Sequence, residues 1–94
     1  MAKVTKKHQR ELIDVIQRAA KDKRLLEAFL IDLLTPQEYN DIIARWQIVK
    51  ALARHVTQRD IAQNLKVSIA KITRGSRELL DENGGFKQVL REFY

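Results

Sequence analysis

The chain has 94 residues, and its eighteen basic and twelve acidic residues give it a formal net charge of +6 at neutral pH. It has no cysteine and only two histidines, which excludes a disulfide framework, a thiolate metal site and a zinc site made by the histidines alone. No apolar run approaches the roughly 18 residues of a membrane-spanning helix, and the basic start lacks the apolar core of a signal peptide, so we expect a cytoplasmic protein.

Turn-forming residues are few, with one proline and three glycines. This composition predicts an all-α fold, and the length predicts a single domain over residues 1–94. A chain this short is marginal for a large core of its own, so a second subunit is a natural way to bury more apolar surface. The positive net charge favours a polyanionic partner.

The first helix is predicted from about residue 5 to about residue 20, where apolar residues recur at helical spacing. Asp22 begins a second, short helix, whose segment at residues 25–34 is apolar almost all round. Only Glu27 and Asp32 interrupt that segment, and a small surface helix would not tolerate such a pattern. We therefore expect it to be buried between subunits. A membrane-surface role fits poorly, because the basic residues precede the segment and do not line its polar edge.

A third, long helix is predicted to begin at Pro36. Thr35 is its N-cap, proline suits the first helical position, and Glu38 completes a capping box. The expected apolar face consists of Ile42, Trp46, Val49, Ala53 and Val56, at spacings of three and four residues. We interpret Trp46 as a core or interface residue, because an indole buries a large area.

The segment at residues 57–76 predicts a short helix, a tight turn and a second helix, which together form a helix-turn-helix at about residues 58–80. Thr57 and Ser68 are the expected N-caps of the two helices. Lys66 stands where a turn glycine is usual, so the turn is expected to be less tight than average. The expected inward positions are Ile61, Ala62 and Leu65, then Val67 in the turn, then Ile69, Ile72, Ser76, Leu79 and Leu80.

The outward face of the second helix carries Lys71, Arg74 and Arg77, within a stretch, residues 50–77, that holds seven basic residues and one acidic residue. Lys71 lies in the first turn of its helix, where the macrodipole makes a cation mildly unfavourable. A neighbouring phosphate backbone would explain both this cation and the amides at the helix start. The alternative is an ordinary solvated charged face.

Asn83, Gly84 and Gly85 supply residues that tolerate a positive φ. The second helix of the motif is therefore predicted to end near Leu80 to Glu82, and a sixth and last helix to run from Gly85 to Phe93. The apolar stripe of that last helix consists of Phe86, Val89, Leu90 and Phe93.

Four stretches of the chain resemble the tryptophan repressor family. They are LTPQE at residues 34–38, Arg45 followed by Ile48 and Val49, TQRD at residues 57–60, and IAKITRGS at residues 69–76. The region over which these stretches match in order and spacing covers about half of the chain. The combination of ITRGS with the upstream LTPQE is specific to this family. The resemblance implies a six-helix, intertwined homodimer that binds a palindromic operator when L-tryptophan occupies a site beside each recognition helix.

The resemblance also implies the residues of the ligand site. Arg45 and Arg74 would hold the indole between their guanidinium planes, and Arg74 would also pair with the ligand carboxylate. The Thr35 hydroxyl would assist at that carboxylate, and the backbone carbonyls of Asp32 and Leu34 would receive the ammonium. In the family these two halves of the site come from different subunits.

Several of these residues have a second explanation. Gly75 would let the flat ring approach closely, but close packing between helices explains a mid-helix glycine equally well. Thr35 is also explained as a helix cap, and Arg45 as a surface cation. Glu78 departs from the family, which usually has a small hydroxyl residue there. Its carboxylate would either pair with the ligand ammonium, or pair with Arg74 and compete with the ligand carboxylate.

The predicted DNA contacts are Gln58, Arg59, Ser68, Ile69, Ala70, Lys71, Thr73 and Arg77. Arg59 is able to make a bidentate contact to guanine. Lys71 and Ala62 depart from the family on the DNA face, and the segment between Ile48 and Val56 is one residue shorter than the family pattern. The family's operator sequence is therefore not transferable to this chain.

The sequence thus predicts an L-tryptophan-dependent transcriptional repressor of tryptophan metabolism genes that uses no enzyme cofactor. One alternative is a DNA-binding regulator of the same superfamily with a different ligand or none. An RNA-binding or purely structural helical module is another. An enzyme is disfavoured, because the chain has no cysteine, no spaced set of histidines and carboxylates, and no glycine-rich phosphate loop.

Overall fold

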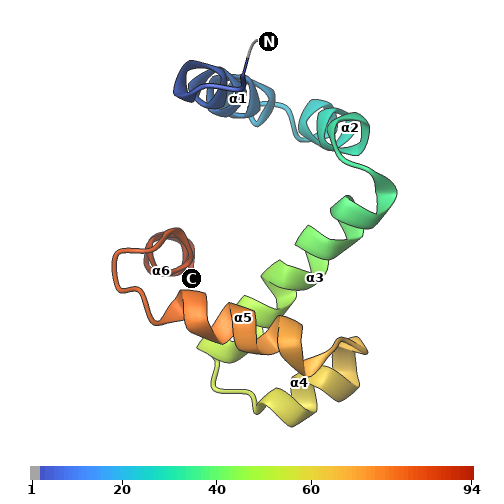
Figure 1. Ribbon diagram of the computed structural model, residues 1–94, viewed down its shortest axis with the longest axis vertical. Coiled ribbons are helices and arrows are strands. Elements are labelled where there is room, and N and C mark those ends of the chain that lie inside the picture. The colour runs from blue at the N-terminus through green and yellow to red at the C-terminus, as the bar shows by residue number, and fades with distance from the viewer. Residues whose placement is uncertain (1–2) are drawn as a thin grey trace. The chain divides into compact units, whose positions relative to one another are not determined.

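The computed structural model describes residues 3–94. These residues form six α-helices and no strand, as predicted (Figure 1). The helices are α1 (Lys6–Ala19), α2 (Lys23–Leu33), α3 (Pro36–Ala53), α4 (Gln58–Leu65), α5 (Ile69–Leu79) and α6 (Gly85–Phe93). The chain divides into two compact units, Met1–Tyr39 and Asn40–Tyr94, and a single domain over residues 1–94 stays a prediction.

Helix α1, in the first unit, begins with a reciprocal cap. The Thr5 hydroxyl accepts a hydrogen bond from the His8 N–H (3.4 Å), and the Thr5 N–H donates to His8 Nδ1 (3.1 Å). Histidine here takes the place of the usual glutamate or glutamine of a capping box. Helix α2 follows the Asp22 cap, whose carboxylate accepts the N–H groups of Arg24 and Leu25. This confirms the predicted start of the second helix.

The apolar side chains of α2 are covered only partly by the first unit. No residue of α2 is buried, and Ala19 of α1 is the only buried residue among residues 3–39. Leu25, Ile31 and Leu33 keep 56%, 49% and 47% of their area exposed. The predicted burial of this segment is therefore not met within the first unit, and its coverage by a second subunit stays a prediction.

Helix α3 begins at Pro36 with the predicted capping box. The Thr35 N–H donates to Glu38 Oε1 (2.8 Å), and the Glu38 N–H donates to Thr35 Oγ1 (3.1 Å). Further along the helix the buried residues are Ile48 and Val49. The predicted apolar face included Val49 but missed Ile48. The prediction assumed one apolar stripe along α3, whereas α5 packs against both Ile48 and Val49.

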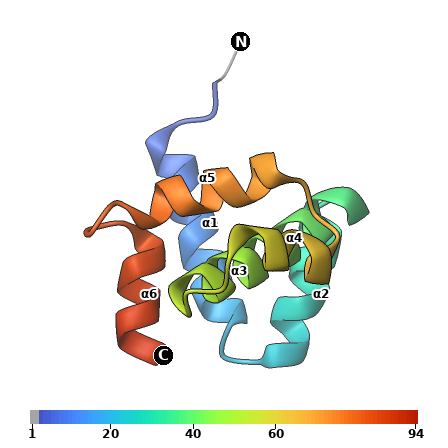
Figure 2. The same ribbon diagram turned by 90° about the horizontal axis from the view of Figure 1, so that it is seen from below.

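Three isoleucines form the core of the second unit. Ile48 of α3, Ile61 of α4 and Ile72 of α5 are each at most 2% exposed and form one cluster. The partly buried residues packed against this cluster are Ala51, Leu52, Val56, Ala62 and Val67. Figures 1 and 2 show α4 and α5 joined by a short turn beside the second half of α3. The inner face of α5 is therefore fixed by packing.

Three positions that were expected to face inward are exposed instead. Ile69 is the first residue of α5 and Leu80 is its C-cap, so both lie at the ends of the helix, away from its packed middle. Leu65, at the end of α4, is exposed as well. In the middle of α5, Ile72 is buried as predicted.

The turn between α4 and α5 depends on the backbone of Lys66. This residue has φ 54° and ψ 47°, which is the left-handed conformation. Glycine adopts it without strain, whereas a residue with a side chain does so at a cost of about 1–2 kcal/mol. The lysine thus has the backbone conformation of the turn glycine that it replaces.

The connection from α5 to α6 has the predicted bounds, because α5 ends at Leu79 with Leu80 as its C-cap and α6 runs from Gly85 to Phe93. Neither Gly84 nor Gly85 uses the positive φ that glycine tolerates. A Cβ on Gly84 would instead lie 3.2–3.3 Å from atoms of Asp81. The Asp81 carboxylate also accepts the Asn83 N–H (3.0 Å). Glycine therefore permits the close approach of the chain to Asp81.

Helix α6 is held by aromatic contacts and by ion pairs within the second unit. The Trp46 ring on α3 lies 6.4 Å from the Phe86 ring and 5.7 Å from the Tyr94 ring, measured between centroids. Glu82 pairs with Lys87 (3.2 Å) and Arg91 (3.0 Å). Lys87 beside it, and more weakly Arg91, hold the pKa of the Glu82 carboxyl below its usual value. These contacts hold α6 against α3 and against the loop that precedes α6.

Candidate nucleic-acid interface and ligand site

The exposed face of α5 carries the predicted cations. Lys71, Arg74 and Arg77 are exposed, whereas Ile72 and Gly75 are buried. This pattern follows from the helical period, since the buried residues face the core and the cations lie on the other side. Helix α5 therefore presents three positive charges to solvent, while its opposite face is packed against the core.

The predicted DNA contacts all lie on the surface. Each of the eight residues, from Gln58 to Arg77, is exposed. Ser68 caps α5 by accepting the Lys71 N–H (3.3 Å), and Thr57 caps α4 by accepting the Asp60 N–H (3.2 Å). Both predicted N-caps are thus confirmed, and the residues at both helix starts are accessible to a partner.

Lys71 has a partner within the chain that the sequence did not reveal. Its Nζ lies 3.6 Å from Oδ1 of Asp41 on α3, and the two side chains are 55% and 35% exposed. A carboxylate at this position offsets the unfavourable effect of the helix dipole on the lysine. Asp41 is far from Lys71 in sequence, so the only available signal was a cation without a local explanation.

Four of the predicted ligand residues lie on α3 and α5 in the second unit. Arg45, Arg74 and Glu78 are exposed, and Gly75 is buried. A Cβ on Gly75 would lie 3.2 Å from Ile48 Cγ2, which is tighter than ordinary van der Waals contact. The close approach of α5 to α3 therefore explains this glycine, as one of the two sequence hypotheses expected.

The other three predicted ligand residues belong to the first unit. Asp32 lies in the last turn of α2, Leu34 is its C-cap, and Thr35 precedes α3. Carbonyls at the end of a helix lack the N–H partner of the next turn, which makes them candidate acceptors for an ammonium group. The Thr35 hydroxyl already accepts the Glu38 N–H, so its role as a helix cap is confirmed.

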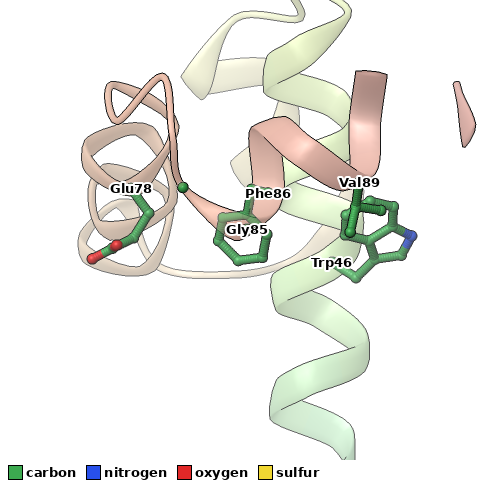
Figure 3. Close-up of a pocket in the computed structure, with 6 residues that line it drawn as sticks. Trp46, Glu78, Gly85, Phe86 and Val89 are labelled. Carbon is green, nitrogen blue, oxygen red and sulfur yellow. The ribbon is translucent and has the colours of Figure 1, made fainter. Parts of the chain in front are cut away.

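Glu78 lines a cavity of about 490 Å³ in the second unit. The other lining residues are Trp46, Gly84, Gly85, Phe86 and Val89. Figure 3 shows Val89 beside the Trp46 ring, and Glu78 on the neighbouring helix. In the described part of the chain Glu78 makes no ion pair with Arg74. The cavity thus has a mostly apolar lining, and the Glu78 carboxylate is turned away from the Trp46 and Phe86 rings (Figure 3).

No group of three or more histidine, aspartate or glutamate side chains in residues 3–94 could hold a metal ion. None of the helices in these residues has the length and apolar character needed to cross a membrane.

Comparison with known proteins places this arrangement in a family. The family model described as Trp repressor protein matches residues 7–94. A Vibrio cholerae protein named Trp operon repressor homolog is 38% identical over 85 residues, which cover 85% of this chain and 82% of the relative. No solved structure matches the chain significantly.

Two further relatives carry the same name, Trp operon repressor homolog. The protein from Chlamydia trachomatis serovar D is 42% identical over 71 residues, covering 70% of this chain and 76% of the relative. The protein from Actinobacillus succinogenes is 44% identical over 73 residues, covering 77% and 71%. The chain belongs to the Trp repressor family, whose members are DNA-binding transcriptional repressors and not enzymes.

Proposed function

We propose that this protein is a cytoplasmic, homodimeric repressor that binds a palindromic operator of tryptophan metabolism genes when L-tryptophan is bound. The observation that carries the proposal is the exposed row of Lys71, Arg74 and Arg77 on α5, opposite a buried inner face, in a chain of this family. The name of the relatives, Trp operon repressor homolog, supports the choice of genes and of ligand.

The apolar surface of α2 supports the homodimer. Among residues 3–94 the buried apolar residues are only Ala19, Ile48, Val49, Ile61 and Ile72, which is a small core for a chain of this length. A second copy, intertwined through α2, would cover the exposed area of Leu25, Ile31 and Leu33. Residues 1–94 would then act as one domain in each subunit. Two-fold symmetry would place two α5 helices at successive major grooves, one helical turn apart.

In this proposal α4 and α5 form the DNA-binding helix-turn-helix. The contacts would come from Gln58, Arg59, Ser68, Ile69, Ala70, Lys71, Thr73 and Arg77, all of which are exposed. Arg59 suits bidentate recognition of guanine. The basic side chains would meet phosphates, which gives affinity and a strong dependence on salt concentration.

L-Tryptophan would bind on the α3–α5 side of each recognition helix. Arg45 and Arg74 would stack on the indole, with Arg74 also pairing with the carboxylate, and Gly75 would lie beside the ring. The Thr35 hydroxyl and the carbonyls of Asp32 and Leu34 would come from the second subunit. Glu78 would face the ligand ammonium. The bound ligand would fix the angle of α5 so that both copies fit the operator.

Glu78 also favours a second candidate function, a regulator of the same superfamily that uses another ligand or none. The family usually has a small hydroxyl residue at this position, whereas Glu78 lines a mostly apolar cavity with Trp46 and Phe86. Calorimetric titration with L-tryptophan distinguishes the two candidates. Saturable binding at one site per subunit supports the co-repressor, and no binding supports the second candidate.

Selection of duplex DNA from a random library, with and without L-tryptophan, tests the whole proposal. We expect the same palindrome to be enriched only when the ligand is present. Enrichment of a palindrome that does not depend on the ligand would favour the second candidate. The absence of any enriched duplex, together with binding of RNA at the same salt concentration, would contradict DNA repression altogether.

Arg74 provides the sharpest test of the ligand site. Arg74→Ala is expected to weaken L-tryptophan binding by about tenfold or more and to abolish ligand-dependent DNA binding, with the dimer intact. Arg74→Lys is the matched control, because it keeps the positive charge but lacks the planar guanidinium. We expect it to lose ligand dependence as well. Unchanged ligand dependence in both variants would remove Arg74 from the site.

A further inference from the structure

We propose that Asp41 restrains Lys71 in the DNA-free protein and thereby lowers its affinity for DNA. This inference rests on the proposed function, because it assumes that α5 binds DNA. It concerns one ion pair, in which Lys71 Nζ of α5 lies 3.6 Å from Asp41 Oδ1 of α3. Both residues belong to the second unit.

The ion pair gives a reason for a cation at an unfavourable place. Lys71 lies in the first turn of α5, where the helix dipole disfavours positive charge. Its backbone N–H is already satisfied by the Ser68 hydroxyl. The ammonium group reaches across to the carboxylate of Asp41, so the free protein has its own anion at the position where DNA would supply a phosphate.

The chemistry of the pair allows this exchange. A lysine ammonium is a compact point charge that binds carboxylate or phosphate oxygens alike. The Lys71 side chain is 55% exposed, so a phosphate is able to approach it from solvent. Ion pairs with this much exposure are weak. DNA therefore displaces Asp41 at a small cost, and that cost appears as a lower affinity.

Lys71 differs in this respect from its neighbours on the same face. In the part of the chain that the structure describes, Arg74 and Arg77 form no ion pair. Asp41 lies one helical turn before Arg45 on α3, and Lys71 lies about one turn before Arg74 on α5. The Asp41 carboxylate thus restrains one of the three cations on α5. The pair lies one helical turn away from Arg45 and Arg74, the two arginines proposed to hold the ligand. We assign Asp41 as a positioning residue for Lys71.

A double-mutant cycle on DNA affinity tests the proposal. Asp41→Asn, Lys71→Gln and the double variant are compared with the unmodified protein on one fixed DNA duplex over a series of salt concentrations, with L-tryptophan at saturating concentration throughout. Asp41→Asn alone is expected to tighten binding by about threefold to tenfold for a dimer with two such pairs. In the Lys71→Gln background the same change is expected to have a clearly smaller effect.

The cycle separates the ion pair from the charge of Asp41 itself. Removal of the Asp41 carboxylate abolishes its repulsion of DNA to the same extent in the unmodified protein and in Lys71→Gln. Only the difference between the two effects of Asp41→Asn therefore reports on the ion pair with Lys71. Glu92→Gln on α6 removes the same charge elsewhere and is expected to have a smaller effect than Asp41→Asn. Lys71→Gln is also expected to reduce the slope of log affinity against log salt by about 1 per subunit.

The possible results distinguish a failure of the Asp41 restraint from a failure of the proposed DNA binding. Equal effects of Asp41→Asn in the two backgrounds, with DNA binding retained, would overturn the restraint and leave the proposed function intact. If the unmodified protein bound no duplex at any salt concentration, both proposals would be wrong. The nitrogen chemical shift of the Lys71 ammonium in the DNA-free protein is a second readout. It should change in Asp41→Asn, and an unchanged shift would also overturn the inference.

Discussion

The two units of this chain differ in how far they bury their own apolar residues. In the first unit Ala19 is the only buried residue among residues 3–39, and Ile31 of α2 is 49% exposed. In the second unit Ile48, Ile61 and Ile72, from three different helices, close into one buried cluster. The second unit thus fixes α5 with residues of the same chain. The first unit has apolar surface that is typical of an interface.

The largest expected effect is on dimer stability and comes from placing a charge in the apolar surface of α2. Burial of one isoleucine contributes about 1.5–3 kcal/mol, and a homodimer would bury two copies. Ile31→Lys should therefore raise the dimer dissociation constant by about a hundredfold or more, measured by sedimentation equilibrium. Val4→Lys, at a position that is 90% exposed, is the control and should leave the dimer unchanged. A dimer that tolerates Ile31→Lys would remove α2 from the interface.

A smaller effect, on the free energy of unfolding, is expected from a substitution in the core of the second unit. Ile72→Ala should lower the free energy of unfolding by about 3 kcal/mol, because Ile72 is fully buried (0% exposed) and the substitution leaves a cavity. Ile69→Ala removes the same atoms from the same helix at a position that is 53% exposed. It should cost less than about 1 kcal/mol. Urea unfolding of both variants at one protein concentration checks the contrast, and equal losses would contradict the assigned core.

The smallest effect concerns the ion pairs that secure α6. Lys87 and Arg91 lower the pKa of Glu82 below its usual value. A carboxyl whose pKa is lowered by folding stabilises the folded state at neutral pH, and this contribution is lost as the pH falls through the lowered pKa. Because the Glu82 side chain is 70% exposed, the effect should be small.

Thermal unfolding measured from neutral to acid pH checks this expectation. Glu82→Gln should unfold at a slightly lower temperature than the unmodified protein at neutral pH, and the difference should disappear in acid. Glu92→Gln, which removes the same charge from α6, serves as the control. A difference between Glu82→Gln and the unmodified protein that persists or grows in acid would contradict the assigned ion pairs.

Local chemistry made the helix boundaries predictable. The cap formed by Thr35 and Glu38, the Asp22 cap and the Ser68 cap each involve residues at most three apart, so their spacing is visible in the sequence. The exposed cations of α5 followed from the helical period in the same way. Residues whose surroundings lie within one helical turn were therefore placed correctly.

Contacts between distant segments accounted for what was missed. The burial of Ile48 depends on how closely α5 crosses α3, and the Lys71–Asp41 pair depends on the same crossing. The candidate ligand residues were predicted from family resemblance. Of these, Gly75 has an explanation in helix packing as well.

The most direct test of tryptophan-dependent repression is the reciprocal coupling between ligand and DNA. Equilibrium titrations would measure the affinity of the selected duplex with and without L-tryptophan, and the affinity of L-tryptophan with and without that duplex. We expect both affinities to rise by the same factor, about 5-fold to 150-fold. A duplex affinity that L-tryptophan does not change, or two unequal factors at equilibrium, would contradict the proposed mechanism.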